Sequence, residues 1–243
     1  MNYLPILSAA LSRGGHYADI FFENTLANSL VLQDGIVSQA SQTVSYGAGI
    51  RTLAGDRTGY AYTMDLSERE LLKAAHSAAC IADGGATTQP LALSATAPLT
   101  ENRYPILRPW TEIGVEATKD MLMALDAFAR GLDPRVVKVR AAINNRTQEV
   151  RFANSLGETF LDVRPRATLI VIVVMQDGTQ TEMGYASEAA SMGGEFLTTE
   201  RIQRVAREAV RRATIMFEAV QPEGGEIPVV MAAGASEIGR AHV

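Results

Sequence analysis

The residues that most often bind metals and move protons are few and scattered in this chain. Its histidines are His16, His76 and His242, and none of the spacings HExxH, CxxC or HxH occurs. A zinc site needs three or four ligands that converge on one point. The sequence therefore predicts no locally assembled metal site, and we expect structural or surface roles for His16 and His76.

Cys80 is the single cysteine, and it lies among alanines in a segment with helical periodicity. We interpret it as a small packed hydrophobic residue, because a reactive thiolate would need a basic or cationic neighbour. One cysteine cannot form an internal disulfide, which is typical of a reducing compartment. The chain is therefore expected to be cytoplasmic.

Two glycine-containing stretches begin like known motifs and then depart from them. In "GASEIG", Ile238 occupies the position of the second glycine of a nucleophile elbow. In "GAGIRT", Thr52 replaces the third glycine of a dinucleotide fingerprint, and a strand follows where a helix is required. Neither stretch predicts a site.

The remaining charged candidates also have simpler interpretations. An arginine stripe at helical spacing could dock an acidic partner or phosphates, but Glu200 and Glu208 interrupt it, which favours a solvated helix face. Its members are Arg201, Arg204, Arg207, Arg211 and Arg212. Asp19, Glu23 and Asp162 are isolated and do not indicate an acid–base pair. From the residues alone, no catalytic, metal or cofactor-binding residue is predicted.

The elements that would have to position a site form two groups of strands and helices. After a short apolar helix near the N-terminus, strand patterns begin at Tyr17, with hairpin turns at Asp34-Gly35 and near Gly55-Asp56. A helix follows, and Ser67 with Glu70 is typical of a capping box at its start. These features predict a first α+β subdomain over residues 1–82.

Residues 83–109 are rich in Gly, Thr, Ala and Pro and predict a linker. Over 110–222 we expect a helix, strands with a turn at Asp177-Gly178, and a helix over about 199–220. The stretch "ATLIVIVVM" predicts a central strand that is covered on both faces. The chain is therefore expected to be α+β, with two antiparallel-sheet-plus-helix subdomains joined by a linker.

Composition excludes some classes of function. The net charge of −5 argues against a nucleic-acid binder. No apolar run approaches the roughly 20 residues that span a bilayer, so no membrane association is expected. The apolar N-terminus has no preceding basic region and does not resemble a signal peptide.

Four stretches, in this order and spacing, resemble the N-terminal half of a TldD-type protein of the TldD/PmbA zinc metallopeptidase family. They are "YADIFFENT", "VLQDGIVSQASQTVSYGAGIRTLAGDRTGYAYT", "ANSLGETFLDVRPRATLIVIV" and "GGEIPVVMAAGAS". The resemblance covers residues from about Tyr17 to Ser236. The last stretch favours the TldD branch over the PmbA branch.

The resemblance implies a peptidase that hydrolyses unfolded or modified peptides and pairs with a PmbA/TldE-type subunit or forms a homo-oligomer. Its zinc is expected on a His-Glu-x-x-x-His helix that would follow the strand in 223–236, so none of its site residues carries over to this chain. We therefore expect this fragment to contain no cofactor and to be inactive alone. The alternative that the family offers is a non-catalytic regulatory module, a PmbA-like subunit or a modulator of DNA gyrase.

After Ser236 the sequence departs from the family. Residues 237–243, EIGRAHV, are what GAG ATC GGA AGA GCA CAC GTC encodes, and this DNA resembles a common short-read sequencing adapter. We therefore expect 223–236 to be the start of a truncated catalytic domain, and 237–243 to be a non-native tail. The alternative is a genuine short protein with its own terminus.

Overall fold

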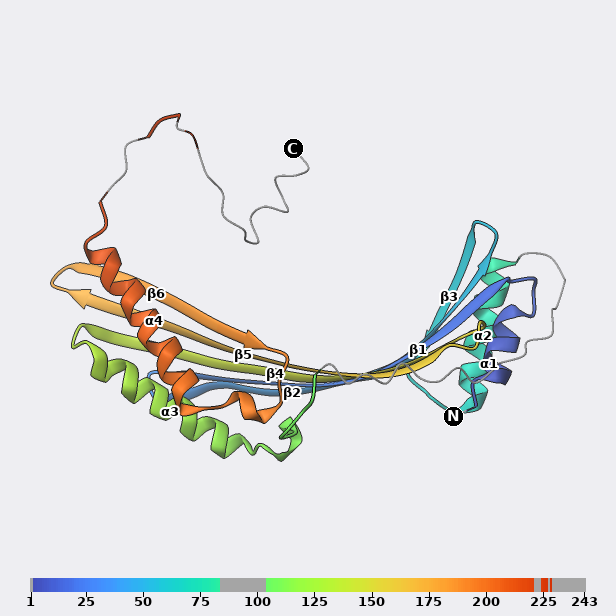
Figure 1. Cartoon of the computed structure of the whole chain (residues 1–243), viewed down its shortest axis with the longest axis horizontal. Helices are drawn as coiled ribbons and strands as arrows, with labels where there is room; N and C mark the ends of the chain where they lie inside the picture. The colour runs from blue at the N-terminus through green and yellow to red at the C-terminus, as the bar shows by residue number, and fades with distance from the viewer. Residues whose placement is uncertain (1, 84–103, 221–223, 227, 229–243) are drawn as a thin grey trace.

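A computed structural model describes residues 2–83, 104–220, 224–226 and 228. It contains a single six-stranded antiparallel sheet with strand order β3-β2-β1-β4-β5-β6 (Figure 1). The strands are β1 (Tyr17–Gln33), β2 (Ile36–Ala54), β3 (Arg57–Thr63), β4 (Val136–Asn154), β5 (Thr159–Asp177) and β6 (Gln180–Ala190).

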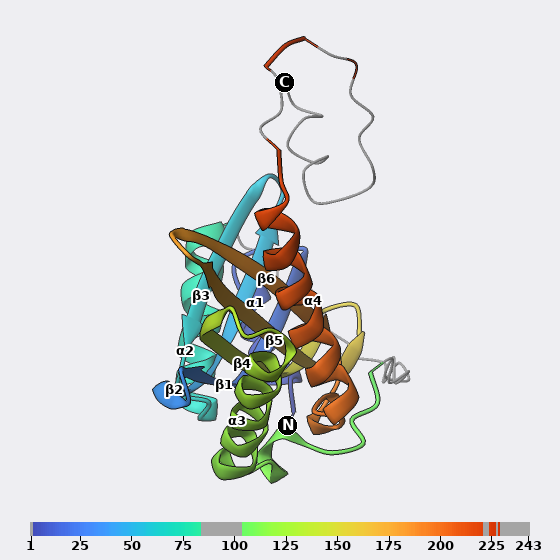
Figure 2. The ribbon, with the colours of Figure 1, turned by 90° about the vertical axis from the view of Figure 1, so that its left-hand side faces the viewer.

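Four α-helices accompany this sheet in the described part of the chain, two at each end. They are α1 (Leu4–Leu11), α2 (Glu68–Ala82), α3 (Val115–Leu132) and α4 (Thr199–Phe217). Short 3₁₀ turns, η1 (Trp110–Glu112) and η2 (Gly194–Phe196), precede α3 and α4. Figures 1 and 2 show α1 beside α2 at one end of the sheet, and α3 beside α4 at the other.

The α+β class predicted from the sequence is confirmed, but the two groups of strands do not form separate sheets. β1 pairs with β2 along one side and with β4 along the other, so the strands of both groups are continuous. The prediction overlooked this because cross-strand pairing between segments more than 100 residues apart leaves no local signal in the chain. The boundaries 1–82, 83–109 and 110–222 stay a prediction.

Two hydrophobic cores lie on the same face of the sheet. Because side chains alternate along a strand, the even-numbered residues of β1 share a face. Ile20 and Phe22 belong to the core under α1 and α2, while Leu30 and Leu32 belong to the core under α3 and α4. We call this side the helix face and the opposite side the open face. Residues 23–29 of β1 belong to neither core, and we call the region around them the waist.

The two halves of the chain have the same element order. Each has a helix, three antiparallel strands and a helix, and in the sheet the first half runs outward from β1 and the second from β4. Because β1 and β4 are antiparallel, the halves are related by an approximate two-fold axis between these strands. The short outer strands β3 and β6 occupy equivalent positions.

Turns are present at Asp34-Gly35 and at Gly55-Asp56 as expected, whereas the β5–β6 turn lies one residue later than expected, at Gly178-Thr179, because Asp177 still pairs with Gln180. Asp34 and Gly35 have φ of 50° and 75° in the β1–β2 hairpin, and Gly55 and Gly178 have φ of 64° and 58° in the β2–β3 and β5–β6 hairpins. Positive φ at both central positions of the β1–β2 turn is typical of type I′, and positive φ at the first position alone, as at Gly55 and Gly178, is typical of type II′; both types match the twist of the strands.

Two local predictions are wrong. The Ser67–Glu70 capping box does not form: the Ser67 side chain makes no capping bond, and the Ser67 N–H instead donates to the Asp65 carboxylate at 2.9 Å. Residues 167–175 of β5 are not covered on both faces. Alternate residues from Ala167 to Met175 are buried under the helices, whereas those on the open face, such as Ile170 and Ile172, are only half-buried. The strand after residue 223 lies outside the described residues.

Candidate functional site

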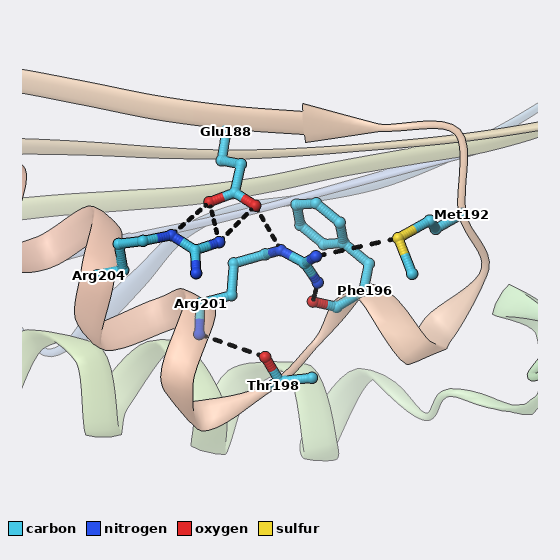
Figure 3. Close-up of polar contacts among 6 residues, drawn as sticks. All are labelled: Glu188, Met192, Phe196, Thr198, Arg201 and Arg204. Carbon is cyan, nitrogen blue, oxygen red and sulfur yellow. Dashed lines mark hydrogen bonds and ion pairs between the residues drawn. The ribbon is translucent and has the colours of Figure 1, made fainter.

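A cluster of ion pairs and hydrogen bonds joins β6 to α4. The Glu188 carboxylate accepts hydrogen bonds from Arg201 Nε at 2.6 Å and from Arg204 Nη2 at 2.7 and 2.8 Å (Figure 3). Arg201 also donates to the carbonyl of Phe196 and lies over its ring, with 4.5 Å between the guanidinium carbon and the ring centroid. We call these four residues the arginine clamp.

The electrostatics of the arginine clamp favour a structural role. Burial acts to raise the pKa of Glu188, but the hydrogen bonds from Arg204 and Arg201 outweigh it and hold that pKa below its ordinary value of 4.5. Both carboxylate oxygens are already bound by arginines. A carboxylate in this state is a poor general base, so the cluster can hold a helix on a strand but offers no acid–base chemistry.

The rest of the arginine stripe is also engaged within the chain. Arg207 lies 5.0 Å from the ring centroid of Phe128 on α3, and Arg211 and Arg212 both pair with Glu208 at 2.7 Å. These two arginines lower the pKa of Glu208 to about 2. The cations of the stripe are thus matched to neighbours on the same helix, on α3 and on β6, which favours a structural role over docking of an acidic ligand.

The histidines and the cysteine do not come together. The Gly55 N–H donates to His16 Nδ1 at 3.3 Å beside the β2–β3 turn, whereas His76 lies on the exposed side of α2. Cys80 is also exposed, so its prediction as a packed residue is wrong. The buried stripe of α2 consists of residues such as Ala75, Ala78 and Ala79, and Cys80 projects from the other side. His242 lies outside the described residues.

The isolated carboxylates have local partners. Asp19 pairs with Arg51 across β1 and β2, Asp162 pairs with Arg164, and the Thr25 hydroxyl donates to Glu23 at 2.7 Å. In the described part of the chain, no three His, Cys, Asp or Glu side chains are close enough to hold a metal ion. "GAGIRT" lies within β2, as expected, and "GASEIG" falls outside the described residues.

Two cavities at the waist, on the helix face, were not foreseen from the sequence. One, of about 400 Å³, lies between Trp110 of η1 and the strands, and its polar groups include Asn28 and Asn145. The Gln42 amide donates to Asn28 at 2.9 Å, and the Asn28 amide donates to Asn145 at 3.0 Å, forming an amide ladder across three strands. The described residues that line it include no titratable group, so this cavity can bind but supplies no acid–base chemistry.

The second cavity, of about 420 Å³, lies at the other side of the waist, near α1. It is lined by aromatic and charged residues that include Tyr3, Tyr46 and the ion pair Glu149–Arg151, whose atoms are 2.7 Å apart. Polar strand residues in otherwise alternating segments were the only sequence signal for either cavity. Such residues also occur on ordinary solvated strands, so they did not single out a site.

Two family models match the chain: "PmbA/TldA metallopeptidase domain 1" over residues 18–82, and "PmbA/TldA metallopeptidase central domain" over 108–217. The chain belongs to the TldD/PmbA family.

Individual relatives agree with this assignment. The chain is 30% identical to the metalloprotease TldD homolog of Haemophilus influenzae, over 96% of this chain and 49% of the relative. It is 25% identical to the TldD homolog of Buchnera aphidicola, over 90% and 46%. The chain thus spans about half the length of the curated relatives it matches.

Solved structures share the fold. A Thermotoga maritima protein described as a proposed modulator of a DNA gyrase superposes with a TM-score of 0.71 at 19% identity, covering 90% of this chain and 49% of that one. TldE from Thermococcus kodakarensis superposes with a TM-score of 0.61 at 16% identity, covering 82% and 44%. At these identities the likeness supports the fold alone.

No helix among the described residues is both long enough and apolar enough to cross a membrane.

Proposed function

We propose that this chain is the N-terminal region of a cytoplasmic, TldD-type zinc metallopeptidase that hydrolyses peptide bonds in unfolded or modified peptides. The observation that carries the proposal is the identity to a TldD homolog over nearly the whole chain, together with two metallopeptidase domain models in the expected order. In this assignment the chain is a framework region that works with a PmbA/TldE-type partner or a second copy.

The described residues do not provide a set of ligands for zinc. His16 and His76 lie on different elements, and no group of three ligands exists among the residues described. We therefore propose that the metal ligands belong to a part of the full protein beyond these residues, and that this chain alone is inactive. The described side chains support no step of the hydrolysis.

Zinc binding and activity can be measured separately. Calorimetric titration of the 243-residue chain with zinc is expected to show no tight stoichiometric site, and the chain is expected not to cleave an unfolded peptide. A longer product of the same locus is expected to cleave it in a chelator-sensitive way. Chelator-sensitive cleavage by the short chain would contradict the proposal, and so would a longer product that is inactive with zinc and its partner subunit.

A non-catalytic role is the second candidate, because a structural relative is described as a proposed modulator of a DNA gyrase. That role requires contact with another protein. Pull-downs of the chain against gyrase and against a PmbA-type subunit distinguish the two functions: capture of gyrase alone favours the regulatory role, and capture of the subunit alone favours the peptidase.

A further inference from the structure

Two strand edges of the sheet are equivalent but differently composed. β3 pairs with β2 only from Ala48 onward, which leaves residues 36–47 of β2 at the edge of the sheet. β6 pairs with β5 only from Ala167 onward, which leaves residues 159–166 of β5 at the opposite edge. The approximate two-fold axis between β1 and β4 relates these two edges, so each is an internal reference for the other.

The β5 edge carries the features that natural proteins use to prevent strands from pairing. Within eight residues it has Asp162, Arg164, Pro165 and Arg166. Charged side chains oppose burial against another strand, and proline removes a backbone donor. This edge is therefore blocked.

The β2 edge has almost none of these features. Residues 36–46, IVSQASQTVSY, contain no Asp, Glu, Lys, Arg or Pro, and all eleven are exposed. The one protective device is a bulge at Ser38, where Val31 and Leu32 of β1 pair with Gln39 and Val37. Residues 39–46 are regular, and among the described residues no strand pairs with them on the side away from β1.

We propose that the β2 edge pairs with the β2 edge of a second copy of this chain, antiparallel about a two-fold axis that places Gln42 opposite Gln42. This names the interface of the assembly in the proposed function and rests on that function for its biological setting. Pairing would join two six-stranded sheets into one.

The register of the proposed pairing is limited by the two ends of the free segment of β2, residues 36–47. The bulge at Ser38 ends it on one side, and the end of β3 limits it on the other, since the Thr63 carbonyl lies 3.0 Å from where a Cβ on Gly47 would be. Within the regular residues 39–46, a two-fold centre at Gln42 pairs residues 39–45 and a centre at Thr43 pairs residues 40–46; we choose Gln42 because it keeps the pairing one residue farther from β3. A shift toward the N-terminus would bring the bulge at Ser38 into the pairing, and a shift toward the C-terminus would bring the second chain closer to β3.

The segment is complementary to itself on both faces. With Gln42 at the axis, Ala40 lies opposite Val44 on the helix face. On the open face Ser41 meets Thr43, and Gln39 meets Ser45. Apolar side chains thus meet apolar ones, polar meet polar, and no like charges face each other. An unrelated peptide would match only the backbone, so the second copy is the occupant that this pattern favours.

Disulfide trapping tests the register. In a Cys80→Ser background, Gln42→Cys should cross-link rapidly into a dimer under mild oxidation, because directly opposed residues in antiparallel strands fall within disulfide range. Ser45→Cys is the matched control: it is equally exposed on the same edge, but its copies would lie about 20 Å apart. Equal cross-linking of the two variants would overturn the proposal.

A charge on the edge tests the interface itself. Sedimentation velocity of the 243-residue chain should show a concentration-dependent dimer, and Thr43→Lys should weaken it about tenfold or more. Thr181→Lys, on the outer strand β6, should leave it unchanged. A monomer at all concentrations, or a dimer that Thr43→Lys leaves intact, would refute the pairing. A heterodimer with a PmbA-type subunit that excludes the homodimer would refute the second copy as occupant while leaving the peptidase assignment standing.

Discussion

At both ends of the sheet, a glycine in the outer strand allows a helix to pack closely against that strand. At one end α2 lies on β3, and at the other α4 lies on β6. A Cβ on Gly59 of β3 would lie 1.9 Å from the Ala78 carbonyl oxygen, and a Cβ on Gly184 of β6 would lie 1.9 Å from that of Ala209. Both glycines begin the sequence Gly-Tyr-Ala. In each half, an outer strand without a side chain at this point lets the helix backbone approach closely.

The helices themselves follow one pattern. The six buried residues of α2 are Leu71, Ala74, Ala75, Ala78, Ala79 and Ala82. The six buried residues of α4 are Ile202, Val205, Ala206, Ala209, Val210 and Ala213, each 131 positions later (202 minus 71, and likewise for the others). Small residues persist where the helix meets the glycine, and larger ones replace alanine elsewhere on α4. The comparison distinguishes the small residues that both ends need for close packing from the residues that differ between the two ends.

The largest expected effect comes from filling the shared contact. Gly184→Ala and Gly59→Ala should each lower the free energy of unfolding by about 3 kcal/mol, because the new methyl group would overlap helix backbone that cannot move independently. Urea denaturation measures this. Gly131→Ala in α3 is the control: no atom lies within 4 Å of the place that its methyl group would take, and alanine favours a helix, so stability should stay equal or rise slightly. If only one of the two contact variants is destabilised, the ends are not equivalent.

The arginine clamp is an additional contact between helix and strand at the α4 end of the sheet. Glu188→Gln should cost about 1–2 kcal/mol at neutral pH, since hydrogen bonds to a charged group are lost in a partly buried place. The folded-state pKa of Glu188 is depressed, so its contribution is full above its ordinary value of 4.5 and is lost as pH falls through the lower folded-state pKa. Wild type should therefore lose more stability than Glu188→Gln upon acidification below about pH 4.5.

The matched control for this pH effect is Glu182→Gln on the same strand, whose carboxylate accepts only from the Gln180 amide among the described contacts. The free energy of unfolding of Glu182→Gln should fall with decreasing pH in the same way as that of wild type. If wild type and Glu188→Gln lost the same free energy of unfolding as pH falls below about 4.5, the arginine clamp would contribute no proton-linked stability.

Local features of the fold could be predicted from the sequence, because they depend on residues that are close along the chain. The Asp34-Gly35 hairpin and the helix at Thr199 follow from turn chemistry and hydrophobic periodicity. The pairing of β1 with β4 could not be predicted, since it joins residues such as Asp19 and Asn154 without any local signal. The repeated Gly-Tyr-Ala was visible in the sequence, but its meaning depends on which helix packs over it.

For the candidate site, the sequence indicated that acidic residues interrupt the arginine stripe, and Glu208 does pair with Arg211 and Arg212, but the sequence did not indicate Glu188 as the partner of Arg201 and Arg204. Glu188 lies on another element, and only the sheet–helix packing brings it to Arg201 and Arg204. Cys80 was misassigned because its alanine neighbours are on the buried stripe while it is not. In both cases the missing information is which side of an element faces its neighbour.

The smallest expected effect concerns how the two equivalent helices begin. The Thr198 hydroxyl accepts from the Arg201 N–H at 3.2 Å, whereas Ser67, the corresponding residue of α2, makes no such bond. Thr198→Ala should therefore cost about 1 kcal/mol, and Ser67→Ala only a few tenths. Because the Ser67 N–H is instead bound by Asp65, Asp65→Ala should have the larger effect at the α2 end. Urea midpoints of the three variants measure these differences, and equal losses for Thr198→Ala and Ser67→Ala would mean that both helices are capped by their own hydroxyl in solution.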